Sequence, residues 1–163
     1  KAGVGFTPIG NTYSTPFSGI FDGQKNEIRN IYINTPKDSN AKALFGYIKS
    51  SKIKNLGVTG EIEASLNYVG GIVGNSSNEN LIINCYNKVN IKNSSKAGGI
   101  IGRAYDGITI KKCSNYASID SGTSEVGGIV GQVNNYAIID ECCNYGNLTL
   151  RASGIVGEIY VSR

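Results

Sequence analysis

The chain contains no histidine, and this absence excludes several kinds of chemistry. Catalytic triads with a histidine base and zinc sites of the His-Glu-x-x-His type both need that side chain. Tryptophan and methionine are also missing, and there are only 3 prolines. Because no initiator methionine is present, we expect a mature form or an internal segment of a longer protein.

Long apolar runs and dense charge clusters are missing as well. No run approaches the roughly 18–20 residues that cross a bilayer, and no basic-then-apolar leader opens the sequence, so we predict no membrane insertion. The net charge of +4 comes from 16 Lys and Arg against 12 Asp and Glu, spread thinly. Nucleic-acid binding favours a denser basic stripe with interleaved aromatic residues, so we predict no nucleic-acid partner.

Glycine, by contrast, is abundant, and much of it falls in a repeated pentapeptide. Residues 70–74 (GGIVG) return as 98–102 and 127–131 and, with serine first, as 153–157. The steps between the last glycines are 28, 29 and 26 residues (102 − 74, 131 − 102, 157 − 131), and a weaker copy ends 28 residues upstream at Gly46 (74 − 46). Repeats of this length are typical of solenoids, in which each unit buries its apolar face against its neighbours.

A second set of repeated positions indicates β-strands. At steps of 25, 29, 28 and 29 residues stand Ile31, Leu56, Cys85, Cys113 and Cys142. Three positions before each is an isoleucine: Ile28, Ile53, Ile82, Ile110 and Ile139. Six positions after the last four come Ile62, Ile91, Ile119 and Leu148. We predict an all-β, right-handed parallel β-helix of about five coils of 25–29 residues, a coil being one turn of the solenoid.

This fold forms a single domain with two parts. Residues 1–42 are a leading segment that holds the first strands, and residues 43–163 are the repeated coils. Neither end shows an evident cap, so we expect flanking domains of the parent chain to cover the terminal strands.

Alternation within each coil separates inward from outward side chains. Because Ile119 must be buried, the odd-numbered residues of 113–119 face inward. The same phase places Asn87, Asn115 and Asn144 inside at a corner, where stacked amides can form a hydrogen-bonded ladder. The glycine pairs are interpreted as corners that need a positive φ or a close backbone approach.

Three of the four cysteines share this inward phase: Cys85, Cys113 and Cys142. Stacked about 5 Å apart, they can be packed thiols, one inter-coil disulfide or a zinc site. Packed thiols are favoured, because directly stacked parallel strands give poor disulfide geometry and buried cysteine behaves as a small apolar residue. Cys143 faces outward and is the thiol expected to react first.

The pentapeptide, the Asn-Cys-Tyr at 84–86 or Cys-Ser-Asn-Tyr at 113–116 about eleven residues later, and FSGIFDG at 17–23 together resemble bacterial GLUG-motif repeats. The resemblance covers roughly residues 6–157. It implies a large secreted or cell-surface protein, such as an adhesin, a filamentous-haemagglutinin-like protein or the non-catalytic part of a streptococcal immunoglobulin A1 metalloprotease. It implies no catalytic residue, and we predict no metal and no cofactor.

Two acidic pairs are candidate catalytic groups of a polysaccharide-degrading β-helix. Glu61 and Glu63 share a face, and Asp140 and Glu141 lie beside the start of a coil. A glycosidase needs two carboxyl groups about 5–9.5 Å apart across a substrate cleft. Because nothing repeats around these residues to build a cleft, we interpret them as solvated surface charges.

The outward face offers a binding hypothesis. Tyr116 and Tyr145 occupy equivalent outward positions that continue a column from Lys88, with Tyr86 nearby. Such tyrosines suit sugar rings or a protein partner, or they stabilise the sheet as cross-strand pairs. We predict a non-catalytic structural or adhesive module of a secreted or cell-surface bacterial protein, with a host or cell-surface protein or glycan as partner. The alternative is a carbohydrate-binding or polysaccharide-lyase-like β-helix that uses this tyrosine face.

Overall fold

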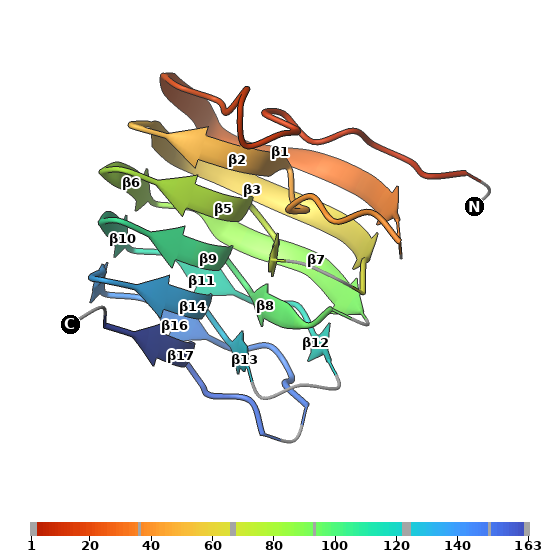
Figure 1. Ribbon diagram of the computed structural model, residues 1–163. Helices are drawn as coiled ribbons and strands as arrows, with labels where there is room; N and C mark the ends of the chain where they lie inside the picture. The colour runs from red at the N-terminus through yellow and green to blue at the C-terminus, as the bar shows by residue number, and fades with distance from the viewer. Residues whose placement is uncertain are drawn as a thin grey trace.

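The computed structural model describes residues 3–35, 37–65, 68–92, 94–121, 125–149 and 151–161. Within these ranges every regular element is a β-strand. The chain winds into a β-solenoid of about five turns (Figure 1). In Figure 1 the nearer strands run to the left and the farther ones to the right while the chain descends, so the winding is right-handed. No helix in the described ranges is long and apolar enough to span a membrane.

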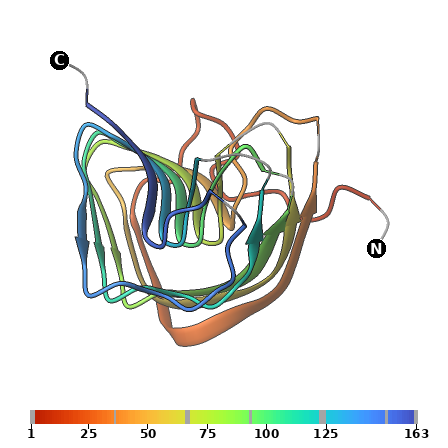
Figure 2. The same ribbon diagram turned by 90° about the horizontal axis from the view of Figure 1, so that it is seen from below.

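The coils wind through three sheets, the smallest of which takes strands from three coils (Figure 2). The largest sheet contains β1 (Ile20–Asn34), β3 (Lys52–Glu63), β6 (Asn80–Ile83), β7 (Tyr86–Lys92), β10 (Ile108–Lys111), β11 (Ser114–Asn115), β12 (Ile119–Asp120), β15 (Ile138–Asp140) and β16 (Cys143–Asn144). The second contains β2 (Phe45–Lys49), β5 (Val73–Ser77), β9 (Ile101–Tyr105), β14 (Val130–Asn134) and β17 (Val156–Tyr160). The third contains β4 (Tyr68–Gly70), β8 (Lys96–Gly98) and β13 (Glu125–Gly127). All pairs of these strands are parallel.

The predicted apolar columns are present in the core. One column pairs Ile53, Ile82, Ile110 and Ile139 in register across four coils. A second pairs Ile62, Ile91, Ile119 and Leu148. The predicted alternation is confirmed too, since Cys113, Asn115 and Ile119 are 0%, 0% and 1% exposed whereas Tyr116 between them is 50% exposed. Packing of like residues from coil to coil therefore builds the core.

The predicted alignment of the first strand is wrong. Ile28 pairs with Val58 and Ile31 with Gly60, which lie five and four residues beyond the predicted partners (58 − 53 and 60 − 56). The strand begins earlier than expected, and Phe21 takes the place opposite Ile53. Two register shifts within β1 insert the extra residues, in the region of the positive-φ residues Gln24, Lys25 and Asn30. The solenoid thus begins inside the leading segment.

The prediction that the glycine pairs form corners with a positive φ is also wrong. None of the glycines in the four pentapeptides, all of them described, has a positive φ. Polar and charged residues adopt that conformation instead, in one column of Asn55, Asn84, Lys112 and Glu141 (φ 53, 53, 53 and 51) and another of Ser50, Asn78, Asp106 and Asn135 (φ 47, 60, 56 and 72). Asparagine and aspartate tolerate this region better than most residues. The asparagines that recur at these positions are therefore the sequence feature from which the corners could have been predicted.

Close approach is the part of the glycine prediction that is confirmed. A Cβ atom on Gly71 would lie 2.0 Å from Asn87 Oδ1, and one on Gly99 would lie 2.4 Å from Asn115 Cγ. Each pair is separated by 16 residues (87 − 71, 115 − 99), as is Gly128 from Asn144 (144 − 128). The second glycine of the pentapeptide therefore leaves room for the asparagine of the same coil.

The two ends of the solenoid differ. Residues 3–19 lie along the first coil, where Ile9 N–H donates to Leu44 O (2.9 Å) and Phe17 N–H to Tyr47 O (2.9 Å). The prediction that this end lacks a cap is therefore wrong for the sheet that contains β2, whereas β1 pairs with no strand but β3 and meets the leading segment only near its end, at the Gly5–Ile33 bridge. At the other end, β15, β16 and β17 are edge strands with a partner on one side only within the described chain.

Candidate functional site

The outward column predicted for binding is present on the largest sheet. Pairing of Asn87 with Asn115, and of Asn115 with Asn144, aligns the residues that follow them, Lys88, Tyr116 and Tyr145. The two tyrosines are 50% and 64% exposed. Their rings are stacked with centroids 5.1 Å apart and planes at 13°.

This stacking limits what the tyrosine column can offer to a ligand. Each ring covers one face of its neighbour, so the column presents ring edges rather than a continuous flat surface. The ring of Tyr86 meets that of Tyr116 edge-on, with centroids 6.4 Å apart and planes at 79°. The three rings form a cross-strand aromatic cluster whose polar rims are exposed. Aromatic residues in protein interfaces expose their rims in the same way.

Tyr86 and Lys88 are held by an internal network. The Tyr86 hydroxyl donates to Glu27 Oε2 (2.7 Å), and Arg29 Nε donates to Glu27 Oε1 (2.9 Å). Lys88 Nζ lies 4.0 Å from the same carboxylate and 5.2 Å from the centroid of the Tyr86 ring. The Tyr86 bond lowers the pKa of Glu27 and raises that of Tyr86. Gly57 makes the contact feasible, because a Cβ there would lie 2.2 Å from Tyr86 Cζ.

The three inward asparagines form a ladder through the coils. Asn87 Nδ2 donates to Asn115 Oδ1, and Asn115 Nδ2 donates to Asn144 Oδ1, both at 2.8 Å. Each Oδ1 also accepts the backbone N–H two residues later, as Val89 N–H does at 2.8 Å and Ala117 N–H at 3.2 Å. Both ends of each amide are thus engaged, and the arrangement is structural.

The cysteines are free thiols, with Cys85 and Cys113 buried, Cys142 half-buried and Cys143 exposed. A hydrogen bond to Cys113, followed by burial, raises the pKa of Cys142 well above its usual range. The bond from Cys142 works to lower the pKa of Cys113, but the bond to Cys85 and burial outweigh it and raise that pKa to about 12. These two thiols are therefore poor nucleophiles at neutral pH.

The acidic pairs lie among surface ion pairs. Lys111 Nζ is 2.6 Å from Asp140 Oδ2 and 3.4 Å from Glu141 Oε1. Lys92 Nζ is 3.4 Å from Glu61 Oε2. Glu63 ends β3 on the same face as Glu61. These contacts are those of exposed charges paired across neighbouring coils.

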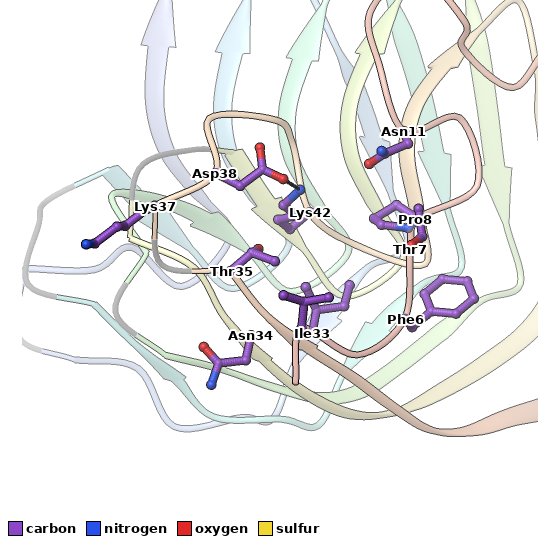
Figure 3. Close-up of a pocket in the computed structure, with 11 residues that line it drawn as sticks. Phe6, Thr7, Pro8, Asn11, Ile33, Asn34, Thr35, Lys37, Asp38 and Lys42 are labelled. Atoms are coloured by element: carbon purple, nitrogen blue, oxygen red, sulfur yellow. Dashed lines mark hydrogen bonds and ion pairs between the residues drawn. The ribbon is translucent and has the colours of Figure 1, made fainter. Parts of the chain in front are cut away.

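A cavity that the sequence did not predict lies between the N-terminal segment and the loop after β1 (Figure 3). It has a volume of about 430 Å³ and apolar walls that include Val4, Phe6, Pro8 and Ile33. At one end stands Lys42, which is 2% exposed and the one buried charged residue among those described. A buried ionisable group beside a cavity is a frequent feature of functional sites.

Lys42 and Asp38 form an organised ion pair at this end. Lys42 Nζ donates to Asp38 Oδ2 at 2.5 Å, while the backbone of Lys42 is fixed by bonds to Tyr68 O and from Gly70 N–H, both 3.0 Å. Asp38 Oδ1 accepts from the backbone N–H of Asn40 (2.9 Å) and its Nδ2 (3.0 Å). Desolvation works to raise the pKa of Asp38, but the bonds from Lys42 and Asn40 outweigh it and hold that pKa below its usual range.

Two residues of the cavity lining each carry an unpaired polar atom that is itself buried. Asn11 Oδ1 and Thr35 Oγ1 are buried and have no hydrogen-bond partner within the described chain. Figure 3 shows Thr35 and Asn11 on different sides of the cavity, whereas Lys37 points away from it. The available signal was a lysine within the apolar run Ala41–Phe45 with an aspartate four residues before it, in a stretch that reads as a loop.

No protein-family model, no curated protein and no solved structure matches the chain. The resemblance to GLUG-motif repeats therefore remains a prediction made from the sequence.

Proposed function

We propose that the chain is a non-catalytic structural and adhesive module of a secreted or cell-surface bacterial protein. The observation that supports this best is the continuity of its columns, in which like residues stack from coil to coil in parallel register. Hydrogen bonds between coils run along the solenoid axis, and each added coil lengthens the solenoid by about 4.8 Å. Such a module extends a protein stiffly and presents a repeating side face.

The adhesive contact proposed on that face is the pair Tyr116 and Tyr145. Exposed tyrosines are enriched in protein interfaces, because they bury a large area with few rotatable bonds and carry a polar rim. Lys88, with a side chain 52% exposed, continues the same column and adds a positive charge. Since each tyrosine ring covers a face of the other, this surface suits a protein on a host or neighbouring cell better than a stack of sugar rings.

Adhesion of protein-coated beads to cultured epithelial cells and to a glycan array tests this function. We expect the double variant Tyr116→Ala/Tyr145→Ala to lower bead adhesion to cells at least tenfold, since two interface aromatics of about 1 kcal/mol or more are removed. Tyr136→Ala is the matched control, because this tyrosine is 55% exposed but lies in the β14–β15 connection. Equal adhesion by the double variant and the control would refute the tyrosine contact.

A further inference from the structure

A small hollow lies on the sheet that contains β5 and β9. It is lined by Asn75, Ser76, Ser77, Arg103 and Tyr105, and by Tyr13 of the N-terminal segment. Asn75 and Arg103 are partners in the parallel register of β5 and β9, which are neighbours in Figure 1, so their side chains leave the sheet next to each other. The volume of about 220 Å³ is below the usual range of roughly 300–1,000 Å³ for sites that hold a whole ligand. The hollow therefore suits a single chemical group of a ligand.

Arg103 brings a positive charge to this hollow. Its Cζ atom lies 4.8 Å from the centre of the Tyr68 ring and 4.7 Å from that of the Tyr105 ring, and its Nε donates to Asn134 Oδ1 at 3.0 Å. Such contacts hold a guanidinium group in place without neutralising it. None of the ion pairs among the described residues includes Arg103, and the described lining contains no acidic residue. The charge is therefore available to an anion.

Hydrogen-bond donors of the same two residues are available as well. The two Nη atoms of Arg103 and the side-chain amide of Asn75 have no hydrogen-bond partner in the described ranges. These atoms are not sealed from solvent, whereas the unpaired Ser76 hydroxyl of the same lining is. Asn75 is only 9% exposed and lines the hollow, so the accessible part of its amide opens into it. Because side chains buried to this degree are usually hydrogen-bonded, the unpaired amide indicates a partner within the hollow.

A carboxylate matches this arrangement in shape and in charge. The two Nη atoms of a guanidinium group donate in parallel, which fits the two oxygens of a planar carboxylate. The Nδ2 atom of Asn75 can donate to one of the same oxygens. One guanidinium balances the single charge of a carboxylate, whereas a phosphate monoester carries about −1.5 to −2 at pH 7 and would keep an excess charge. A neutral group would leave the charge of Arg103 unanswered.

We propose that this hollow binds a carboxylate group, carried by an acidic sugar or by an acidic amino acid. The two Nη atoms of Arg103 pair with the carboxylate oxygens, and Asn75 donates a further hydrogen bond. The hollow and the tyrosine column lie on different sheets, so the test of this site and that of the adhesive contact can fail independently.

Titration of the ¹⁵N-labelled chain, followed by heteronuclear NMR, tests this proposal in about 0.15 M salt, which screens diffuse attraction beyond about 8 Å. Methyl glucuronide and acetylated aspartate amide are the two carboxylates, methyl glucoside is the neutral control and methyl phosphate is the second anion. We expect at least one carboxylate to shift the Asn75 side-chain amide and the Arg103 Nε–H signal, with a Kd of about millimolar for so small a ligand. The tighter of the two identifies the carrier. No shift with either carboxylate, or tighter binding of the glucoside or the phosphate, would overturn the proposal.

Two variants separate a built site from general attraction to a basic surface. Asn75→Ala removes an amide with no internal hydrogen bond, so the chain should remain folded, and the Kd should weaken about tenfold for the loss of one bond to a charged group. Arg103→Lys keeps the charge but removes the paired donors, and should weaken the Kd at least about tenfold.

Lys49→Gln is the matched control, because Lys49 is an exposed cation in register with Ser77 but outside the lining of the hollow. It should change the Kd by less than about twofold, since an exposed charge is screened by salt. An unchanged Kd for Asn75→Ala or Arg103→Lys, or an equal loss for Lys49→Gln, would count against the carboxylate site.

Discussion

The ion pair beside the cavity predicts an unequal response to the removal of its two charges. Lys42 is 2% exposed at its side chain, whereas Asp38 is 37% exposed. Replacement of Asp38 by Asn leaves a buried ammonium group without a countercharge, since Asp38 is the described partner of Lys42. Replacement of Lys42 by Met leaves a carboxylate that water and the two Asn40 donors still solvate. The first change should therefore cost much more than the second.

The magnitudes follow from the burial of each group. Breaking a buried ion pair by removing one partner costs about 3–5 kcal/mol, and the partial exposure of Asp38 points to the lower end, about 3 kcal/mol, for Asp38→Asn. For Lys42→Met we expect a loss below about 1 kcal/mol, because a flexible apolar chain of similar length fills the same space. The double variant should resemble Lys42→Met, since the stranded charge is then absent.

Urea unfolding at pH 7, followed by circular dichroism, measures these free energies. A loss of about 3 kcal/mol should also lower Tm by roughly 6–12 °C for a chain of this size. The double-mutant cycle isolates the coupling between the two side chains. The reasoning is refuted if Lys42→Met destabilises the fold more than Asp38→Asn does, or if the two losses simply add.

Three further outcomes are expected. Gly99→Ala should cost more than about 2 kcal/mol in urea unfolding, because its Cβ would lie 2.2 Å from a backbone oxygen; Gly154→Ala, in the same motif but with nothing within 4 Å, should cost under about 0.5 kcal/mol. The hydrogen bond from the Tyr86 hydroxyl is the largest cause of the lowered pKa of Glu27. This pKa, measured by NMR titration, should therefore rise in the variant Tyr86→Phe. Since a lowered folded pKa stabilises the fold above the unfolded value of about 4.3, this contribution should vanish as pH falls through the folded pKa, and an unchanged pKa would contradict the bond. Iodoacetamide should label Cys143 alone in the native chain, as measured by mass spectrometry. Rapid labelling of a second cysteine would contradict the protection of the other three thiols.

The sequence predicted those parts of the fold that repeat. Isoleucines such as Ile82 and Ile110 recur at fixed steps, and stacking in a parallel solenoid requires that recurrence. The alignment failed in β1, because bulges at positive-φ residues such as Asn30 change the local spacing without a change in residue type. Periodicity carries no information about an irregularity that occurs once.

The contacts of the candidate sites escaped prediction for the same reason. Tyr86 reaches Glu27 across 59 residues by passing over strand β3. Gly57 leaves that space open, since it pairs with Glu27 on one side and with Tyr86 on the other. The outward phase of Tyr86 was readable from alternation, but its partner was not. Lys42 follows a polar stretch that reads as a loop, and the cavity beside it is lined by N-terminal residues such as Phe6 and Pro8, which belong to no repeat.

The irregular chemistry of this protein gathers at the first coil. The Glu27 network, the Lys42–Asp38 pair and the cavity all involve β1, the loop after it or residues 3–19, whereas the later coils repeat the same apolar, asparagine and cysteine columns. Repeated positions are constrained by the residues above and below them, so a new side chain there disturbs two neighbouring coils at once. The first coil has such a neighbour on one side and a non-repeating segment on the other. It is therefore a place where a solenoid of this kind can acquire a binding site without loss of its stacking.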